Sequence, residues 1–194
     1  MVRSAVSADP DTSDHARAHE LQREFEQKAR AELAAADRAA PGSDAVAWSG
    51  DVFAEVALVK GDPGPAEVAG GSALSGPDGV AARKALQALG FDPDSVFRTV
   101  ARPEAGIDSG ALRDRLRLQI EAVDPTAVVA LDAFAAEEVA AAFTLGSLGF
   151  GRPVSSGGRT FLAVDGLEAS LSDERTKRKV WRQLQALAPR PPAL

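Results

Sequence analysis

Three aspartates stand where their carboxylates could act together. Asp62, Asp132 and Asp165 each follow a short apolar run that is typical of a buried strand. Because the carboxyl ends of parallel strands meet at one edge of a sheet, we expect the three side chains to face one crevice. Clustered carboxylates suit a hard divalent cation and phosphate chemistry. In the structural alternative, which we favour, Asp132 caps a helix that begins at Ala133 and the other two are turn residues.

Other metal and redox chemistry has little support in the sequence. His15 and His19 lie one helical turn apart, which is a metal-ligand spacing, but no third ligand accompanies them and we interpret both as solvated. The chain contains no cysteine, which excludes disulfides, thiolate zinc sites, cysteine-held iron–sulfur clusters and cysteine nucleophiles. We therefore expect no metal and no cofactor.

A run of cations near the C-terminus is the candidate for DNA contact. The net charge of −6 opposes broad binding to phosphate backbones, because such binding depends on Lys and Arg that displace counterions. Asp173 and Glu174 balance the run, so we favour a solvated face over a DNA-binding one. If the three aspartates do cluster, the crevice is acidic and repels DNA. The candidate DNA-binding residues are Lys177, Arg178, Lys179 and Arg182.

The elements that must position these residues alternate along the chain. An edge segment over 45–48 is followed by predicted strands over 54–60, 96–101, 126–131 and 159–164. Predicted helices over 77–89 and 133–143, and others capped by Ser109 and Ser172, separate the strands or follow the last one. This alternation predicts a three-layer α/β/α sandwich with a four-stranded parallel central sheet. The glycine- and proline-rich loop after the first strand predicts a ligand pocket at the carboxyl edge of that sheet.

The chain divides into four segments. We expect a disordered N-terminus over 1–13, a helix over 14–40, an α/β domain over 41–188 and a tail over 189–194. The apolar stripe of the first helix is narrow, which favours packing on its own domain over pairing with a partner. The loop over 144–158 carries five glycines, so we expect it to be mobile or wrapped around something. Without an apolar run of membrane-spanning length or a signal peptide, we expect a cytoplasmic protein with no membrane contact, and the Arg- and Ala-rich composition indicates a bacterium.

Five short stretches follow one another along these segments: Lys60–Gly64, Gly71–Gly76, Arg98–Pro103, Val128–Ala136 and Gly166–Trp181. In the same order, they are similar to the motifs GEAPG, GRPFVG, TNVVKCRP, VVALGATAA and HPSALLRDPELKRAVW. These are motifs of the uracil-DNA glycosylase superfamily, which the chain therefore resembles, closest to its bacterial iron–sulfur branch. The resemblance covers roughly residues 45 to 188.

The resemblance does not extend to the residues that perform the family's chemistry. The acidic residue of GEAPG falls on Gly61, and the aromatic residue that stacks on the flipped uracil falls on Leu74. The base-reading asparagine falls on Thr99, and the catalytic histidine falls on Gly166 or, shifted by one, on Asp165. The four cluster cysteines have no equivalent. The resemblance implies a pocket formed by Gly61, Asp62, Pro63, Gly64, Leu74, Thr99, Asp132 and Gly166.

Two functions follow from this pattern. The first is a catalytically inactive uracil-DNA glycosylase-like protein that acts as a binding or assembly module in a DNA-repair setting. The alternative is an active enzyme with a rearranged site around Asp62 and Asp165, either a DNA glycosylase for another base or a metal-dependent phosphate enzyme. We favour the first, because each lost group costs several kcal/mol of transition-state stabilisation, about 3–4 for one oxyanion-type donor. A protein partner is left open, as is DNA.

Overall fold

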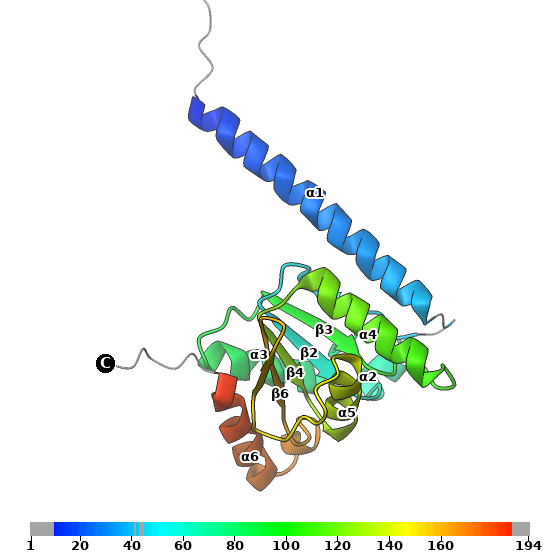
Figure 1. Ribbon diagram of the computed structural model, residues 1–194. Helices are drawn as coiled ribbons and strands as arrows, with labels where there is room; N and C mark the ends of the chain where they lie inside the picture. Colours follow the sequence, from blue (N-terminus) through cyan, green and yellow to red (C-terminus); the bar gives the residue numbers. More distant parts are fainter. Residues whose placement is uncertain (1–9, 41, 43–44, 188–194) are drawn as a thin grey trace, which may run out of the picture.

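The computed structural model describes residues 10–40, 42 and 45–187, and it contains a six-stranded mixed sheet with helices on both faces (Figure 1). Residues 1–9 of the predicted disordered N-terminus over 1–13 and the predicted tail over 189–194 lie outside the described residues. The strands are β1 (Ser49–Gly50), β2 (Val56–Lys60), β3 (Val96–Val100), β4 (Ala127–Ala130), β5 (Val154–Ser156) and β6 (Arg159–Ala163). The helices are α1 (Pro10–Ala39), α2 (Pro65–Val68), α3 (Pro77–Ala88), α4 (Ser109–Val123), α5 (Ala133–Ala142) and α6 (Glu174–Leu184), with short 3₁₀ helices η1 (Ala169–Leu171) and η2 (Gln185–Leu187).

The strand order is β1-β3-β2-β4-β6-β5. The inner neighbours β3, β2, β4 and β6 pair in parallel, and the short edge strands β1 and β5 pair antiparallel to them. The sheet is therefore six-stranded and mixed, which corrects the expectation of a sheet with four parallel strands alone. From β2 the chain moves to β3 on one side and then returns to β4 on the other. The carboxyl ends of β2 and β4 thus flank the point where the strand order reverses.

Two apolar layers hold helices against the sheet. On one face the inward side chains of α4 and α5 pack on alternate strand residues such as Val59 and Phe97. On the other face α3 and α6 pack on residues such as Leu58 and Val129. Buried strands that are covered on both faces consist of nearly continuous apolar runs, which is why the sequence shows no alternation there. The result is three layers, with α3 and α6 side by side on one face (Figure 1).

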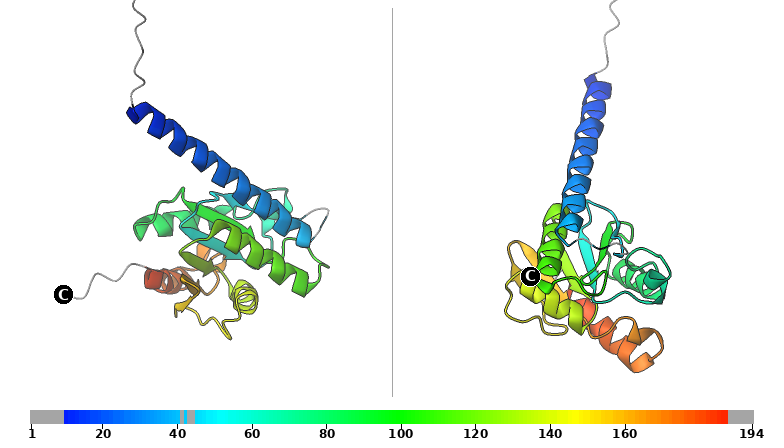
Figure 2. Two further views of the ribbon diagram at one scale, coloured as in Figure 1. Left: turned by 45° about the horizontal axis from the view of Figure 1, so that its top comes forward. Right: turned by 90° about the vertical axis from the view of Figure 1, so that its right-hand side faces the viewer.

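Helix α1 is half docked. Its C-terminal half buries Ala29, Leu33 and Ala36 against the domain, while its N-terminal half projects beyond the α/β body (Figure 2). The helix begins at Pro10, four residues before the predicted start, so residues 10–13 are helical rather than disordered. The packing that we favoured from the sequence therefore holds for the C-terminal half of the helix.

Several local predictions are corrected. Asp108 rather than Ser109 caps α4, accepting a hydrogen bond from Ala111 N at 3.0 Å, and Asp173 rather than Ser172 caps α6. The loop over 144–158 contains β5, which forms a hairpin with β6. Val80 of α3 is 52% exposed. Within the part of the chain that is described, no helix has the length and apolar character needed to cross a membrane.

Candidate functional site

A cavity of about 300 Å³ opens at the reversal point of the sheet. Its walls come from the end of β2, the residue pair after β4, the start of α3 and the segment after β6. This is the place where α/β sheets bind ligands. The lining residues are Lys60, Asp62, Pro63, Asp78, Leu131, Asp132, Gly166, Leu167, Glu168 and Ala169.

Lys60 is the central charge of the cavity. It is the last residue of β2 and is 5% exposed. Its Nζ lies 2.6 Å from Asp78 Oδ2, 3.0 Å from Glu168 Oε2 and 3.6 Å from Glu67 Oε2. Asp78 and Glu67 are themselves buried, whereas the Glu168 side chain is half exposed and covers the outer side.

The surroundings of Lys60 fix its charge. Burial by itself lowers the pKa of the amine, but the hydrogen bonds to Asp78 and Glu168 and the negative charges of Asp78 and Glu67 outweigh it. The pKa of Lys60 is therefore raised above its ordinary value. A permanently protonated amine serves neither as a nucleophile nor as a general base at neutral pH. Its role in this cavity is electrostatic.

Glu67 links this ion cluster to the glycine-rich loop. One carboxylate oxygen accepts a hydrogen bond from Gly64 N at 3.0 Å and the other from Leu74 N at 2.8 Å. A side chain at Gly64 would collide with Lys60 Nζ. The loop therefore closes on the lysine, and its glycine is needed for that close approach.

Asp132 has a structural role. It accepts hydrogen bonds from Ala135 N and from Gly61 N, both at 2.8 Å, so it caps α5 and holds the loop after β2. The cap is the structural interpretation that we favoured for this residue. A side chain at Gly61 would lie 2.5 Å from Asp132 Oδ1 and 3.0 Å from Phe134 Cβ. The position that corresponds to the family's acidic residue therefore has no room for a carboxylate.

The other two aspartates have separate cationic partners. Asp62 Oδ1 lies 2.6 Å from Arg102 Nη2, and the Arg102 guanidinium stacks over the Phe134 ring at 4.4 Å. The hydrogen bond to Asp62 raises the pKa of Arg102. Asp165 pairs with Lys179 of α6 and does not line the cavity. Among the described residues, no three His, Asp or Glu side chains gather as ligands for a metal ion.

Leu74 and Thr99, which the resemblance placed in the pocket, are buried elsewhere. Leu74 is 2% exposed and packs in the core with α3. Its φ of +55° is a conformation that leucine rarely adopts. Thr99 is fully buried on the opposite face of the sheet, where its hydroxyl donates to Gln119 Oε1 of α4 at 2.7 Å.

The remaining predicted pocket residues surround the ion cluster. Pro63 and Gly166 line the cavity, and Gly166 has a φ of +76°. Sequence reasoning missed Lys60, Glu67, Asp78 and Glu168. The available signal was a lysine at the end of an otherwise apolar strand, followed by acidic residues within the next turn-rich segment.

The candidate DNA-binding cations of α6 are partly engaged within the protein. Lys179 pairs with Asp165, and Lys177 Nζ lies 3.3 Å from Glu174 Oε1. Arg178 and Lys177 line a groove between α3 and α6. Arg182 is exposed on the same helix. They therefore do not form one continuous set of free cations.

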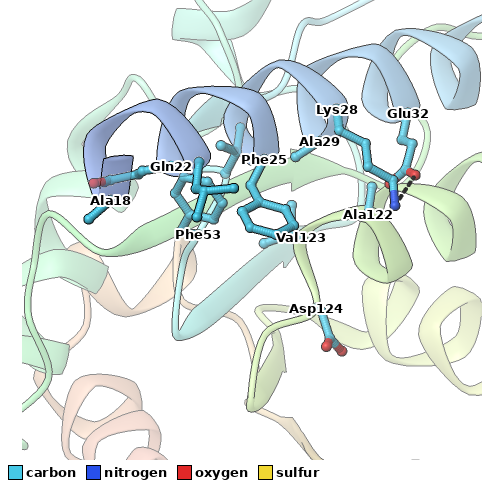
Figure 3. Close-up of a pocket in the computed structure, with 12 residues that line it drawn as sticks. Ala18, Gln22, Phe25, Lys28, Ala29, Glu32, Phe53, Ala122, Val123 and Asp124 are labelled. Atoms are coloured by element: carbon cyan, nitrogen blue, oxygen red, sulfur yellow. Dashed lines mark ion pairs between the residues drawn. The ribbon is translucent and has the colours of Figure 1, made fainter. Parts of the chain in front are cut away.

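A second hollow of about 820 Å³ lies under the projecting half of α1 (Figure 3). Figure 3 shows Phe25 of α1 pointing toward Val123, with Phe53 beside it. Phe25 is 60% exposed and Phe53 is 45% exposed. The ion pair of Lys28 and Glu32, at 3.8 Å, lies along the same side of the helix. The hollow is apolar in the middle and carries charges of both signs at its edge.

Comparison with known proteins adds no family. No protein-family model matches the chain, and no curated protein matches its sequence.

Proposed function

We propose that the chain is a uracil-DNA glycosylase-like protein without glycosylase activity, acting as a binding or assembly module in a DNA-repair setting. The proposal rests on two kinds of support. The motif-like segments follow the family order, and three of them, at the ends of β2 and β4 and after β6, contribute lining residues to one cavity. The groups that would break a glycosidic bond are missing from that cavity.

The observation that carries the proposal is the ion cluster around Lys60. A slot that receives a flipped base needs apolar or aromatic walls and amide groups that read the base edge. Here Lys60 is held by Asp78, Glu67 and Glu168 within 3.6 Å, which fills the end of β2 with paired charges. Inserting a neutral base there would break these ion pairs and leave buried charges without partners.

The electrostatics of the cavity also oppose uracil excision. A departing uracil anion is stabilised by hydrogen-bond donors and positive charge. The cavity walls carry Asp62, Asp78, Asp132 and Glu168 against the single cation Lys60. This excess of negative charge disfavours both the anion and the approach of a DNA backbone.

The alternative of a rearranged enzyme has weaker support. Asp62 and Asp165 were its candidate catalytic residues, and each is paired with a cation, Arg102 and Lys179 respectively. The two ion pairs lie in different surroundings, because Asp62 lines the cavity and Asp165 does not. No observation on the described residues favours this function over a binding module.

An excision assay tests the proposal. The full chain is incubated with uracil-containing single-stranded and double-stranded DNA, with a known uracil-excising enzyme as positive control. We expect no free uracil above background from the chain or from Asp62→Asn and Asp165→Asn variants. Release of uracil at enzyme-like rates would overturn the proposal, and loss of that release in either variant would establish the rearranged enzyme.

A further inference from the structure

The groove between α3 and α6 has a largely apolar lining. It has a volume of about 590 Å³ and lies on the sheet face opposite α4 and α5. Val80 is 52% exposed and Leu171 is 45% exposed, although both are large apolar residues. Trp181 is half buried at its wall. The apolar lining includes Val80, Ala85, Leu171, Val180, Trp181 and Leu184.

The edge of this groove is cationic. Lys84 comes from α3, and Lys177 and Arg178 come from α6. The acidic residue that lines the groove is Glu174, which pairs with Lys177 at 3.3 Å. This local excess of positive charge contrasts with the net charge of −6 of the whole chain. A ligand that matches the groove is therefore apolar along its centre and acidic at its flanks.

We propose that the groove between α3 and α6 is the docking site for an acidic amphipathic helix of a partner protein. An apolar stripe at the spacing i, i+3, i+4 and i+7 would contact Val80, Leu171 and Trp181. Acidic residues beside the stripe would meet Lys84, Lys177 and Arg178. Aromatic and apolar anchors at the centre with charges at the rim are the usual arrangement of such an interface.

The walls of the groove favour a helix over a strand. Both walls are α-helices, whose backbone groups are hydrogen-bonded within each helix. No open sheet edge lines the groove, so an extended peptide has no backbone partners there. Recognition must come from side chains, which is how amphipathic helices bind in grooves.

The chain's own α1 is not the expected occupant. It packs against α4, on the opposite face of the sheet from α3 and α6. Its exposed stretch over 17–28 also has no acidic excess, because three cations balance three acids. A nucleic acid is disfavoured because Trp181 is the one aromatic side chain lining the groove, whereas single-strand binders stack successive bases on several rings.

A matched pair of designed peptides tests the proposal. Both are 18-residue helices with Leu at the stripe positions, flanked by Glu in one peptide and by Lys in the other. We expect the Glu peptide to bind the full chain with a Kd in the micromolar range by titration calorimetry, about tenfold or more tighter than the Lys peptide. Binding of the Glu peptide should weaken as salt is raised.

Charge-reversed variants locate the binding. The double variant Lys84→Glu and Arg178→Glu should bind the Glu peptide about tenfold or more weakly than the natural chain does, and it should bind the Lys peptide more tightly. Arg175→Glu is the matched control, because Arg175 is exposed on α6 but does not line the groove. Urea unfolding of each variant shows whether the fold is retained, and Val80→Ser, at an exposed position, tests the apolar contact independently.

Distinct outcomes overturn the proposal. Equal affinity of the natural chain for the two peptides would mean that the groove does not select an acidic helix. The same conclusion would follow if Arg175→Glu lost as much affinity for the Glu peptide as the groove variant does. Displacement of the Glu peptide by a single-stranded oligonucleotide with higher affinity would assign the groove to nucleic acid, and tighter binding of an α1 peptide would assign it to self-association. The uracil-excision assay tests the cavity around Lys60 and not this groove. The proposed function and the docking proposal can therefore fail independently of each other.

Discussion

Lys60 decides the character of the cavity at the residue scale. A buried amine survives only with close anionic partners, and it has three within 3.6 Å. The partners come from α2, from α3 and from the segment after β6, so one side chain connects three parts of the fold. Because its amine is fully paired within the protein, Lys60 stabilises the structure but is not available to react with a substrate.

The substitution Lys60→Met should destabilise the protein strongly at neutral pH. It leaves Asp78 and Glu67 buried without a cation, which costs about 3–5 kcal/mol for a broken buried ion pair. Glu168→Gln is the control, and its effect should stay below about 1 kcal/mol because the Glu168 side chain is half exposed. Urea unfolding followed by tryptophan fluorescence measures both variants.

The contribution of Lys60 should also depend on pH. Its pKa is raised in the folded protein, so its stabilising effect is complete below the ordinary value of 10.5 and is lost as pH rises through the folded value. The difference in the free energy of unfolding between the natural chain and Lys60→Met should therefore be constant between pH 7 and pH 9 and shrink above about pH 10.5. A difference that stays constant up to pH 12 would contradict the raised pKa.

Asp132 and Asp62 should differ in their effects although both line the cavity. Asp132→Ala removes the cap of α5 and leaves Gly61 N without its acceptor, at a cost of about 2–3 kcal/mol. Asp62→Asn breaks a half-exposed pair with Arg102 and should cost less than about 1 kcal/mol. Chemical denaturation of the two variants compares them, and equal losses would refute the structural assignment of Asp132.

At the element scale, a polar contact anchors α1. Arg115 of α4 is 2% exposed, and its Nε donates to Asp37 Oδ1 of α1 at 3.0 Å. Gln119 Nε2 donates to the same oxygen at 2.7 Å, and Arg115 also reaches Val100 O. Burial lowers the pKa of Arg115, which the charge of Asp37 opposes. The contact explains why the C-terminal half of α1 is held while the half that carries Phe25 projects.

Removing the α1 partner of Arg115 should destabilise the chain through the arginine that remains. Asp37→Ala should cost about 2–3 kcal/mol, less than a fully buried pair because the Asp37 side chain is 40% exposed. Adding Arg115→Met should recover part of that loss, since it removes the unpaired charge. Asp114→Ala, which breaks an exposed pair at 3.8 Å on the same helix, should change the free energy of unfolding by less than about 0.5 kcal/mol. Urea unfolding tests all three variants, and a double variant less stable than Asp37→Ala would contradict this account.

The elements themselves were largely predictable because the strands are apolar on both faces. Strands β2, β3, β4 and β6 begin and end within two residues of their predicted limits. The helix caps were less predictable, because Ser172 and Asp173 are both good capping residues and sequence alone does not choose between adjacent ones. The strand β5 depends on pairing with β6, which a glycine-rich loop sequence does not reveal.

The candidate site was less predictable than the fold for a related reason. Adjacent residues such as Asp132 and Ala133 define a cap that local sequence reveals. The partners of Lys60 are 7, 18 and 108 positions away along the chain. Asp78 and Glu168 meet Lys60 only because α3 and the segment after β6 both pack at the end of β2. Thr99 illustrates the same limit, because alternation along β3 turns its side chain to the face opposite the cavity.

At the scale of the whole molecule, the charge distribution sets what the chain can approach. The net charge is −6, and the cavity at the carboxyl edge of the sheet adds an acidic surface where Asp62 and Glu168 are half exposed. The cations gather instead along α6 and at the groove beside α3. A phosphate backbone is therefore repelled from the cavity and attracted, at most, to one side of the molecule.

This charge distribution predicts weak DNA binding that does not distinguish uracil from thymine. In fluorescence anisotropy, a uracil-containing 20-mer and its thymine counterpart should bind equally, with a Kd weaker than about 10 µM at 150 mM salt, as expected of non-specific contact. Neutralising the cavity surface with Asp62→Asn and Glu168→Gln should increase the affinity for both oligonucleotides to the same extent. The change reduces the repulsion of the phosphate backbone and adds no contact with a base. Lys28→Gln, a charge change on α1 away from the cavity, is the control. A preference of tenfold or more for uracil in any of these chains would mean that a base-reading slot exists and that the ion cluster around Lys60 opens to admit the base.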